Sequence, residues 1–232
     1  MKNIAAGVDE KISFLKSCSY FTALDEPSLK KIAHVTRLCL YEPGETICWQ
    51  GEACIGLYSI QAGSVKLFKL SARGREYIIR VLEEGTTFNE VPVFDRGLNP
   101  VNVAALDECR VWIVPADEIR KTMHEQPEIA AAAILNLTKN LRIMVEKVEE
   151  LSFYQVTNRL ARLIEELPQE QSPNAGSLRM TQDQMAARLG TVREVVARSL
   201  RELERSGAIR VERRQIQIVN QQMLRSWAQE PN

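Results

Sequence analysis

The stretch TQDQMAARLGTVREVVARSL, residues 181–200, contains two helix starts separated by one short turn. At Thr181 and again at Thr191, a hydroxyl residue is followed three positions later by Gln or Glu, which is the pattern of a capping box. Gly190 lies between the two helices and permits a tight turn there. Two capped helices joined in this way predict a helix-turn-helix.

A β-hairpin is predicted directly after the second helix, which should end near Gly207. Apolar residues alternate with polar ones on either side of a turn at 212–215. They are Ile209, Val211, Ile216 and Ile218. A helix at about 154–167 and a polar linker at 168–177 precede this unit. Helix, turn, helix and hairpin together indicate a winged helix-turn-helix.

The charge of the chain is balanced as a whole and is basic only in this C-terminal unit. Lys and Arg together number 30, as do Asp and Glu, whereas eight arginines face four glutamates between residues 188 and 214. Because the rigid fork of arginine matches O6 and N7 of guanine in the major groove, this local excess favours DNA binding. A solvated helix face with ion pairs, such as Arg198 with Glu202 and Arg201 with Glu204, is the alternative.

The N-terminal half reads as short strands separated by glycine turns, from Tyr41 to Val114. Two runs, 57–60 and 65–68, meet at a turn, and further segments lie at 76–82 and 101–114. The turn glycines are Gly44, Gly51, Gly63, Gly74 and Gly85. Short and evenly spaced strands of this kind predict an antiparallel sandwich or barrel.

After Pro115 the pattern becomes helical, with apolar residues at alternating spacings of three and four from about Pro127 to Leu151. Pro127 suits the first turn of this helix. The seam consists of Ile134, Leu137, Leu141, Met144, Val148 and Leu151. A narrow seam of this length predicts pairing with a second copy of the chain, and packing of the helix on its own barrel is the alternative.

The composition predicts a cytoplasmic protein without a membrane partner. No apolar run follows a basic start at residues 1–10, and the longest apolar stretch, 130–135, is too short to span a bilayer. The five cysteines are odd in number and widely spread, so we expect reduced thiols. Cys48 and Cys54 flank a barrel turn, where a redox pair and two buried free thiols are both open.

These motifs, taken in order, resemble the CRP/FNR family of transcription regulators. The sequence REVVAR at 193–198 resembles the family's recognition helix, and EPGE at 42–45, QGE at 50–52 and GSVKL at 63–67 resemble its barrel signature. The resemblance covers about Phe21 to Asn220. Barrel motifs alone are shared by many cyclic-nucleotide-binding modules, whereas barrel, long helix and winged helix in this order are specific to the family.

The resemblance implies an α+β fold with an N-terminal double-stranded antiparallel β-barrel, jelly-roll-like in form. It divides the chain into an effector-sensing barrel (1–126), a dimerisation helix with its hinge (127–153) and a winged helix-turn-helix (154–232). It also implies a homodimeric DNA-binding regulator, an activator in the family's usual mode, with RNA polymerase as a protein partner. Whether binding activates or represses stays open.

For the DNA-binding site, the resemblance implies that Arg193, Glu194 and Arg198 read a half-site similar to TGTGA. Two arginines can each take a guanine, and Glu194 can accept from the amino group of a cytosine. An ion pair between Glu194 and Arg198 is the alternative. The full predicted set of DNA-binding residues is Thr181, Gln182, Thr191, Val192, Arg193, Glu194, Ala197, Arg198, Arg213 and Arg214.

The predicted effector pocket departs from the family's cyclic-nucleotide site. Glu90 is retained, but Asn89 replaces a glycine, and Pro100-Val101 replace the arginine and hydroxyl residue that would hold the phosphate. The residues that match adenine-contacting hydroxyls are apolar. The predicted pocket set is Asn89, Glu90, Pro100, Val101, Met144 and Val145. We therefore expect an effector other than cyclic AMP.

Other cofactors and an enzymatic role find little support. Iron-sulfur sensing needs several N-terminal cysteines, and Cys18 stands alone before Cys39. Haem remains open, with His34 and His124 as the only histidines, although each is more typical of an ordinary surface residue. No His-x-His pair, catalytic triad or glycine-rich phosphate loop is present, so we expect neither a metal site nor an enzyme. The cofactor is unknown from sequence.

Overall fold

The computed structural model describes residues 1–167, 177–178, 180–212 and 215–229. The chain separates into two compact units, Met1–Lys69 with Ile79–Arg142 and Leu70–Ile78 with Ile143–Asn232. The three-part division expected from sequence remains a prediction.

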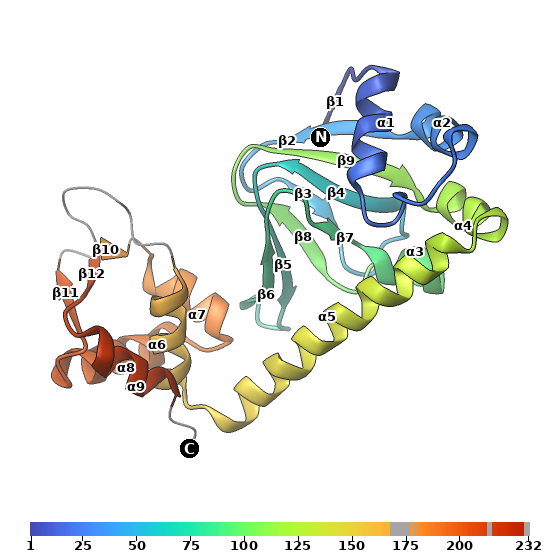
Figure 1. Ribbon diagram of the computed structural model, residues 1–232. Coiled ribbons are helices and arrows are strands. Elements are labelled where there is room, and N and C mark those ends of the chain that lie inside the picture. The colour runs from blue at the N-terminus through green and yellow to red at the C-terminus, as the bar shows by residue number, and fades with distance from the viewer. Residues whose placement is uncertain (168–176, 179, 213–214, 230–232) are drawn as a thin grey trace. The chain divides into compact units, whose positions relative to one another are not determined.

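Two antiparallel sheets form the body of the N-terminal part (Figure 1), in the orders β1-β2-β9-β4-β7 and β3-β8-β5-β6. Their strands are β1 (Lys2–Ile4), β2 (Arg37–Tyr41), β3 (Thr46–Cys48), β4 (Gly56–Ala62), β5 (Val65–Leu70), β6 (Glu76–Leu82), β7 (Thr87–Phe88), β8 (Asn102–Ala105) and β9 (Cys109–Pro115). The predicted double-sheet, jelly-roll-like architecture is confirmed. The runs at 57–60 and 65–68 are consecutive strands that belong to different sheets.

The side chains between the two sheets form one apolar core. Tyr58 of β4 stacks on Phe88 of β7 with ring centroids 4.8 Å apart, and both side chains are buried. All five predicted turn glycines have positive φ, between +74° and +85°, a region that other residues adopt only with strain. The segment predicted at 101–114 is two strands, β8 and β9, because residues 106–108 turn between them.

Five helices accompany the sheets: α1 (Val8–Ser17), α2 (Glu26–Val35), α3 (Glu90–Asp95), α4 (Ala116–Glu125) and α5 (Glu128–Phe153). Sequence reasoning did not predict α1 and α2. Asp25 caps α2 by accepting from the backbone N–H of Ser28 at 2.9 Å. Both helices contribute to a second core, in which Leu15 and Ile32 are fully buried against the outer face of the β4–β9 sheet.

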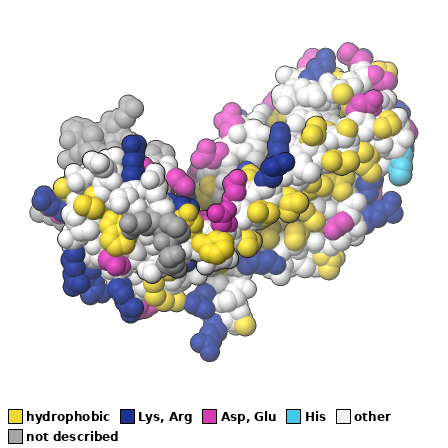
Figure 2. Space-filling view, turned by 60° about the horizontal axis from the view of Figure 1, so that its bottom comes forward, with side chains coloured by type: hydrophobic (Ala, Val, Ile, Leu, Met, Phe, Trp, Pro, Cys, Tyr) yellow, Lys and Arg dark blue, Asp and Glu magenta, His cyan; other side chains and the backbone are white. Residues whose placement is uncertain are grey.

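Helix α5 is the long helix that the sequence predicted, and Pro127 immediately precedes it. Ile129 and Ala133, near its start, are buried. The predicted seam is not: Leu141 is 62% exposed and Val148 is 63% exposed. Figure 2 shows hydrophobic side chains gathered along this helix. Within the first compact unit, Ile134 and Leu141 are therefore not buried on the chain's own barrel, whereas Leu137 is half-buried.

The C-terminal unit contains three further helices around α8, with a small sheet in the order β10-β12-β11. Its elements are α6 (Val156–Glu166), β10 (Ser177–Leu178), α7 (Gln182–Leu189), α8 (Arg193–Arg205), β11 (Ile209–Glu212), β12 (Gln215–Ile218) and α9 (Gln221–Gln229). Leu160, Leu189, Val196 and Leu224 share one buried core. The predicted hairpin is confirmed, with Glu212 paired to Gln215. Most of the predicted linker, 168–177, lies outside the described residues.

The capping box at Thr181 is confirmed, and the one predicted at Thr191 is wrong. The Thr181 hydroxyl accepts from the N–H of Gln184 at 3.2 Å, and the Gln184 side chain accepts from the N–H of Thr181 at 2.8 Å. Val192, not Thr191, is the N-cap of α8, and no side chain caps it. The reason is that the N–H of Thr191 still bonds to the carbonyl of Ala186, so the turn through Gly190 takes one residue more.

Candidate nucleic-acid interface and effector site

Helix α8 has one buried side and one exposed side. Val196, Leu200 and Leu203 are buried in the core of the C-terminal unit. Arg193 and Glu194 are exposed on the first turn of the helix. Because the helix repeats every 3.6 residues, anchoring the apolar side fixes which side chains face solvent.

Arg198, one turn further along, is also exposed, and it forms no ion pair with Glu194 in the part of the chain that the structure describes. The ion pairs expected further along α8 are absent from the same residues. Glu202 instead accepts from the Thr157 hydroxyl at 2.8 Å, and Glu204 accepts from the backbone N–H of Val211 at 3.0 Å. Among the described residues, neither Arg198 with Glu202 nor Arg201 with Glu204 forms the expected ion pair, and whether these arginines contact DNA stays a prediction. Both glutamates thus contact other parts of their own domain, and Arg201 donates its Nε to the carbonyl of Ala197 at 3.1 Å.

Arg193 is oriented by the preceding helix. Its Nε donates to Oε1 of Gln182 at 3.4 Å, and its Nη1 lies 3.8 Å from a carboxylate oxygen of Asp183. Both side chains of the Arg193–Asp183 pair are more than 60% exposed, so this pair contributes little stability. Sequence reasoning missed Asp183, since only the folded turn brings it opposite a residue ten positions later.

The remaining predicted DNA-binding residues surround this surface. Thr181 is exposed, although its hydroxyl is engaged in capping α7. The half-buried ones are Gln182, Thr191, Val192 and Ala197. The predicted phosphate contacts Arg213 and Arg214 lie outside the described residues.

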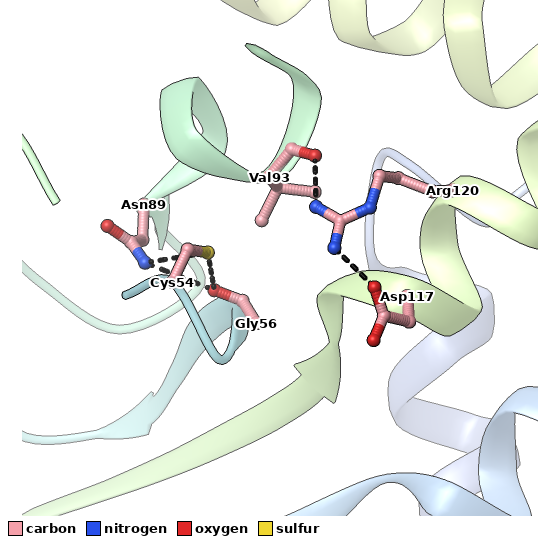
Figure 3. A network of polar contacts seen from close by, with 6 residues as sticks. All are labelled: Cys54, Gly56, Asn89, Val93, Asp117 and Arg120. Carbon is pink, nitrogen blue, oxygen red and sulfur yellow. Dashed lines mark hydrogen bonds and ion pairs between the residues drawn. The ribbon is translucent and has the colours of Figure 1, made fainter. Parts of the chain in front are cut away.

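In the barrel, Asn89 holds the start of α3 in place. Its φ of +71° is left-handed, a conformation that glycine adopts freely and that asparagine tolerates better than most residues. Its Nδ2 donates to the carbonyl of Gly56 at 3.3 Å and to Oδ1 of Asn99 at 3.2 Å, and it contacts the sulfur of Cys54 at 3.4 Å (Figure 3). The replacement of glycine thus keeps the backbone conformation and adds a polar anchor.

Glu90, the next residue, is buried, and its carboxylate accepts from the Thr87 hydroxyl at 2.6 Å. Burial raises the pKa of this carboxyl, and the Thr87 hydrogen bond and the charge of Arg80 oppose the rise. Arg80, on β6, in turn donates to Oδ1 of Asn140 at 2.9 Å. Sequence reasoning missed Thr87, which lies three residues before Glu90, and it missed Arg80 and Asn140, which meet only in the folded chain.

The other predicted pocket residues bring no charge. Pro100 is exposed and Val101 is half-buried. Met144 and Val145 lie on α5 in the second compact unit, and their place in a pocket stays a prediction.

The cysteines are free, and four of the five are buried. Burial raises the pKa of the Cys48 thiol to about 12 and also raises that of Cys54, so neither is a ready nucleophile. The histidines proposed as haem ligands, His34 on α2 and His124 on α4, are both exposed. Within the described ranges, no three His, Cys, Asp or Glu residues are grouped as a metal site would require. In that same part of the chain, no helix is long and apolar enough to cross a membrane.

Comparison with known proteins identifies both parts of the chain. Residues 38–126 match the family described as a cyclic nucleotide-binding domain, and residues 158–227 match the Crp-like helix-turn-helix domain. The cAMP-activated global transcriptional regulator Vfr of Pseudomonas aeruginosa is 30% identical over 190 residues, which cover 78% of this chain and 88% of that protein. A CRP-like cAMP-activated global transcriptional regulator of Mycobacterium tuberculosis is 28% identical over 186 residues, covering 78% of this chain and 83% of that protein.

Solved structures agree on the fold. A transcriptional regulator of the CRP/FNR family from Eubacterium rectale superposes with a TM-score of 0.79 at 21% identity, over 91% of this chain and 99% of that one. The chain belongs to the CRP/FNR family of transcription regulators. The relatives named above are transcription regulators. The family and the winged helix-turn-helix that the sequence predicted are confirmed.

Proposed function

We propose that this protein is a homodimeric regulator that binds an inverted repeat resembling TGTGA and its complement, under the control of an effector other than cyclic AMP. The observation that carries the DNA-binding part is the exposed side of α8. There, Arg193, Glu194 and Arg198 face solvent, and no ion pair joins the last two within the described chain.

The chemistry of these three side chains suits a GC-containing half-site. Each arginine can donate two hydrogen bonds to one guanine, and Glu194 can accept from a cytosine amino group. Arg193 donates a hydrogen bond to Gln182, so its side chain is already partly ordered and loses less conformational entropy when DNA binds. Arg213 and Arg214, which lie outside the described residues, are assigned to phosphate contacts.

The exposed seam of α5 supports the dimer. Ile134, Leu141 and Val148 are each more than 60% exposed, and they recur at heptad spacing on one face of the helix. An apolar stripe of this length on a helix is the pattern that pairs with its own copy. A symmetric dimer would place two copies of α8 about one helical turn apart on DNA.

The effector assignment depends on what the barrel lacks. The relatives named above are cAMP-activated, whereas Pro100 and Val101 of this chain offer a phosphate neither a cation nor a hydroxyl. Glu90 is already engaged by Thr87. A small organic ligand, haem or a thiol switch each remains a candidate, and RNA polymerase is the expected protein partner by family resemblance.

DNA binding is tested with a fluorescent duplex that carries the inverted repeat with half-site centres roughly 10 to 10.5 base pairs apart. A duplex of the same composition in scrambled order is the control. At physiological salt, a specific regulator should bind the repeat on the order of 10³-fold more tightly or better. Equal affinity for the two duplexes, with and without cell-extract metabolites, would contradict the proposal.

A further inference from the structure

A second concave site lies on the barrel, outside the predicted effector pocket. It is an open cavity of about 540 Å³ between α3, α4 and the loop at residues 53–54. We call it the α3–α4 pocket. The residues that matter for its chemistry are Arg96, Gly97, Asp117, Arg120, Lys121 and His124.

The charge around the α3–α4 pocket is predominantly positive. Arg96, Arg120 and Lys121 are permanent cations, and Asp117 is the single carboxylate among the lining residues. Asp117 is already engaged by the Arg120 guanidinium. Neither Arg96 nor Lys121 has an ion pair or side-chain hydrogen bond within the described ranges, so both are free to meet a ligand.

Arg120 is fixed in position. Its Nη1 donates to the carbonyl of Val93 at 2.9 Å, its Nη2 is bound to Asp117, and its side chain is only 19% exposed (Figure 3). One of these two partners, Val93, lies on α3, and the other, Asp117, lies on α4, so Arg120 connects the two helices. A guanidinium held in this way has donors in a set orientation and loses little entropy when an anion binds.

Arg96 occupies a strained backbone position. As the C-cap of α3 it has a φ of +61°, in the left-handed region where glycine is the usual residue. Glycine is in fact the next residue, Gly97, whose N–H donates to Asp95 at 2.7 Å. Strain of this kind persists where the surroundings impose it and gathers at ligand sites. Glycine would adopt this backbone conformation with less strain. The presence of arginine there suggests that its guanidinium binds a ligand.

We propose that the α3–α4 pocket binds a small, multiply charged oxyanion ligand, either a phosphate-bearing or a polycarboxylate metabolite. Arg120 provides an oriented guanidinium, and Arg96 at the end of α3 and Lys121 on α4 provide exposed counter-charges. The inference goes beyond the proposed function, because it requires neither DNA binding nor any particular occupant of the predicted effector pocket.

The test is calorimetric titration of the whole protein at constant ionic strength, with sodium pyrophosphate in one arm, sodium citrate in another and sodium chloride as the baseline. Lys121→Gln and Arg96→Gly remove one rim charge each, and Lys30→Gln on the exposed face of α2 removes a charge elsewhere. We expect binding of one oxyanion to the parent and to Lys30→Gln, weakened at least fivefold in both pocket variants. The arm that responds distinguishes phosphate from carboxylate.

Arg96→Gly also separates a ligand role from a structural one. Without anion, its melting temperature should be equal to or above that of the parent, since glycine relieves the strain at this position. Lost binding together with retained or increased stability supports the pocket. Absence of binding in both arms, or binding that Lys121→Gln and Arg96→Gly leave unchanged, would overturn it.

Discussion

The guanidinium of Arg193 and the side-chain oxygen of Gln182 are joined by a hydrogen bond of 3.4 Å, which connects the start of α8 to the first turn of α7. The two residues are eleven positions apart and are brought together by the turn at Gly190, whose φ is +64°. The orientation of Arg193, which we propose reads a base, thus depends on the helix before it. A change in α7 can therefore alter specificity without touching a base.

Arg198→Ala should reduce specific DNA binding. Removing the bidentate arginine–guanine contact should cost about 1 to 3 kcal/mol in each half-site of the inverted repeat and leave binding to random duplexes nearly unchanged. Fluorescence anisotropy with both duplexes measures the difference. Equal losses on the two duplexes would show that Arg198 contacts phosphate and not a base.

Arg213→Ala should weaken binding to every sequence alike. A wing arginine that contacts phosphate releases counterions on binding, so its loss should reduce the slope of log affinity against log salt by roughly one unit for each protomer of the dimer. Titrations at four or more salt concentrations test this, with Arg198→Ala as the comparison. A changed sequence preference in affinity selection from randomised duplexes would assign Arg213 to base reading instead.

Leu141→Glu should abolish the dimer. Two copies of this residue would bring like charges together in an apolar seam, with little effect on the fold because the side chain is 62% exposed in the single chain. Sedimentation at micromolar concentration should show monomers for this variant and dimers for Lys139→Gln, which changes charge equally on an exposed part of the same helix. A dimeric Leu141→Glu protein would place the interface elsewhere.

Cyclic AMP and cyclic GMP should neither bind with micromolar affinity nor increase DNA affinity. The double variant Pro100→Arg with Val101→Ser would add the missing cation and hydroxyl, and it should bind cyclic AMP measurably more tightly than the parent. Calorimetry on both proteins makes the comparison. Micromolar binding by the parent, coupled to tighter DNA binding, would reverse the effector assignment.

Glu90→Gln should change how stability depends on pH. Because burial raises the pKa of Glu90, the folded protein holds this proton more tightly than the unfolded chain. The contribution of Glu90 to stability is therefore present at low pH and is lost as the pH rises above the ordinary glutamate value of about 4.3. Urea midpoints should fall less in Glu90→Gln than in the parent between about pH 4 and 7, and exposed Glu84→Gln should follow the parent.

Much of this architecture could be predicted because its signals are local. The capping box at Thr181, the turn glycines and the alternation of Ile209 and Val211 each act within a few residues, and the structure confirms them. Helices α1 and α2 were not predicted, because the strand pattern dominates the N-terminal half of the sequence. The cap at Thr191 failed because the preceding turn, rather than the motif, decides where α8 begins.

Only the site residues that belong to a local sequence motif could be predicted. Asn89 and Glu90 were found because a motif places them, whereas Arg80 and Asn140 meet through a contact between segments 60 residues apart. The α3–α4 pocket carries no motif at all. Its cations lie on α4 and at the end of α3, and only folding brings Arg96 and Lys121 to one cavity.

The division of α8 into two sides has a consequence for how such a regulator diverges. Val196 and Leu203 are wholly buried and hold the helix in its domain, whereas Arg193 and Arg198 take no part in that core. Substitutions on the solvent side should therefore cost little folding stability, and under the proposed base contacts they would change the preferred operator. Duplicated copies of the gene could acquire separate regulons by exchanging two or three exposed side chains, while selection on the buried side keeps the scaffold constant.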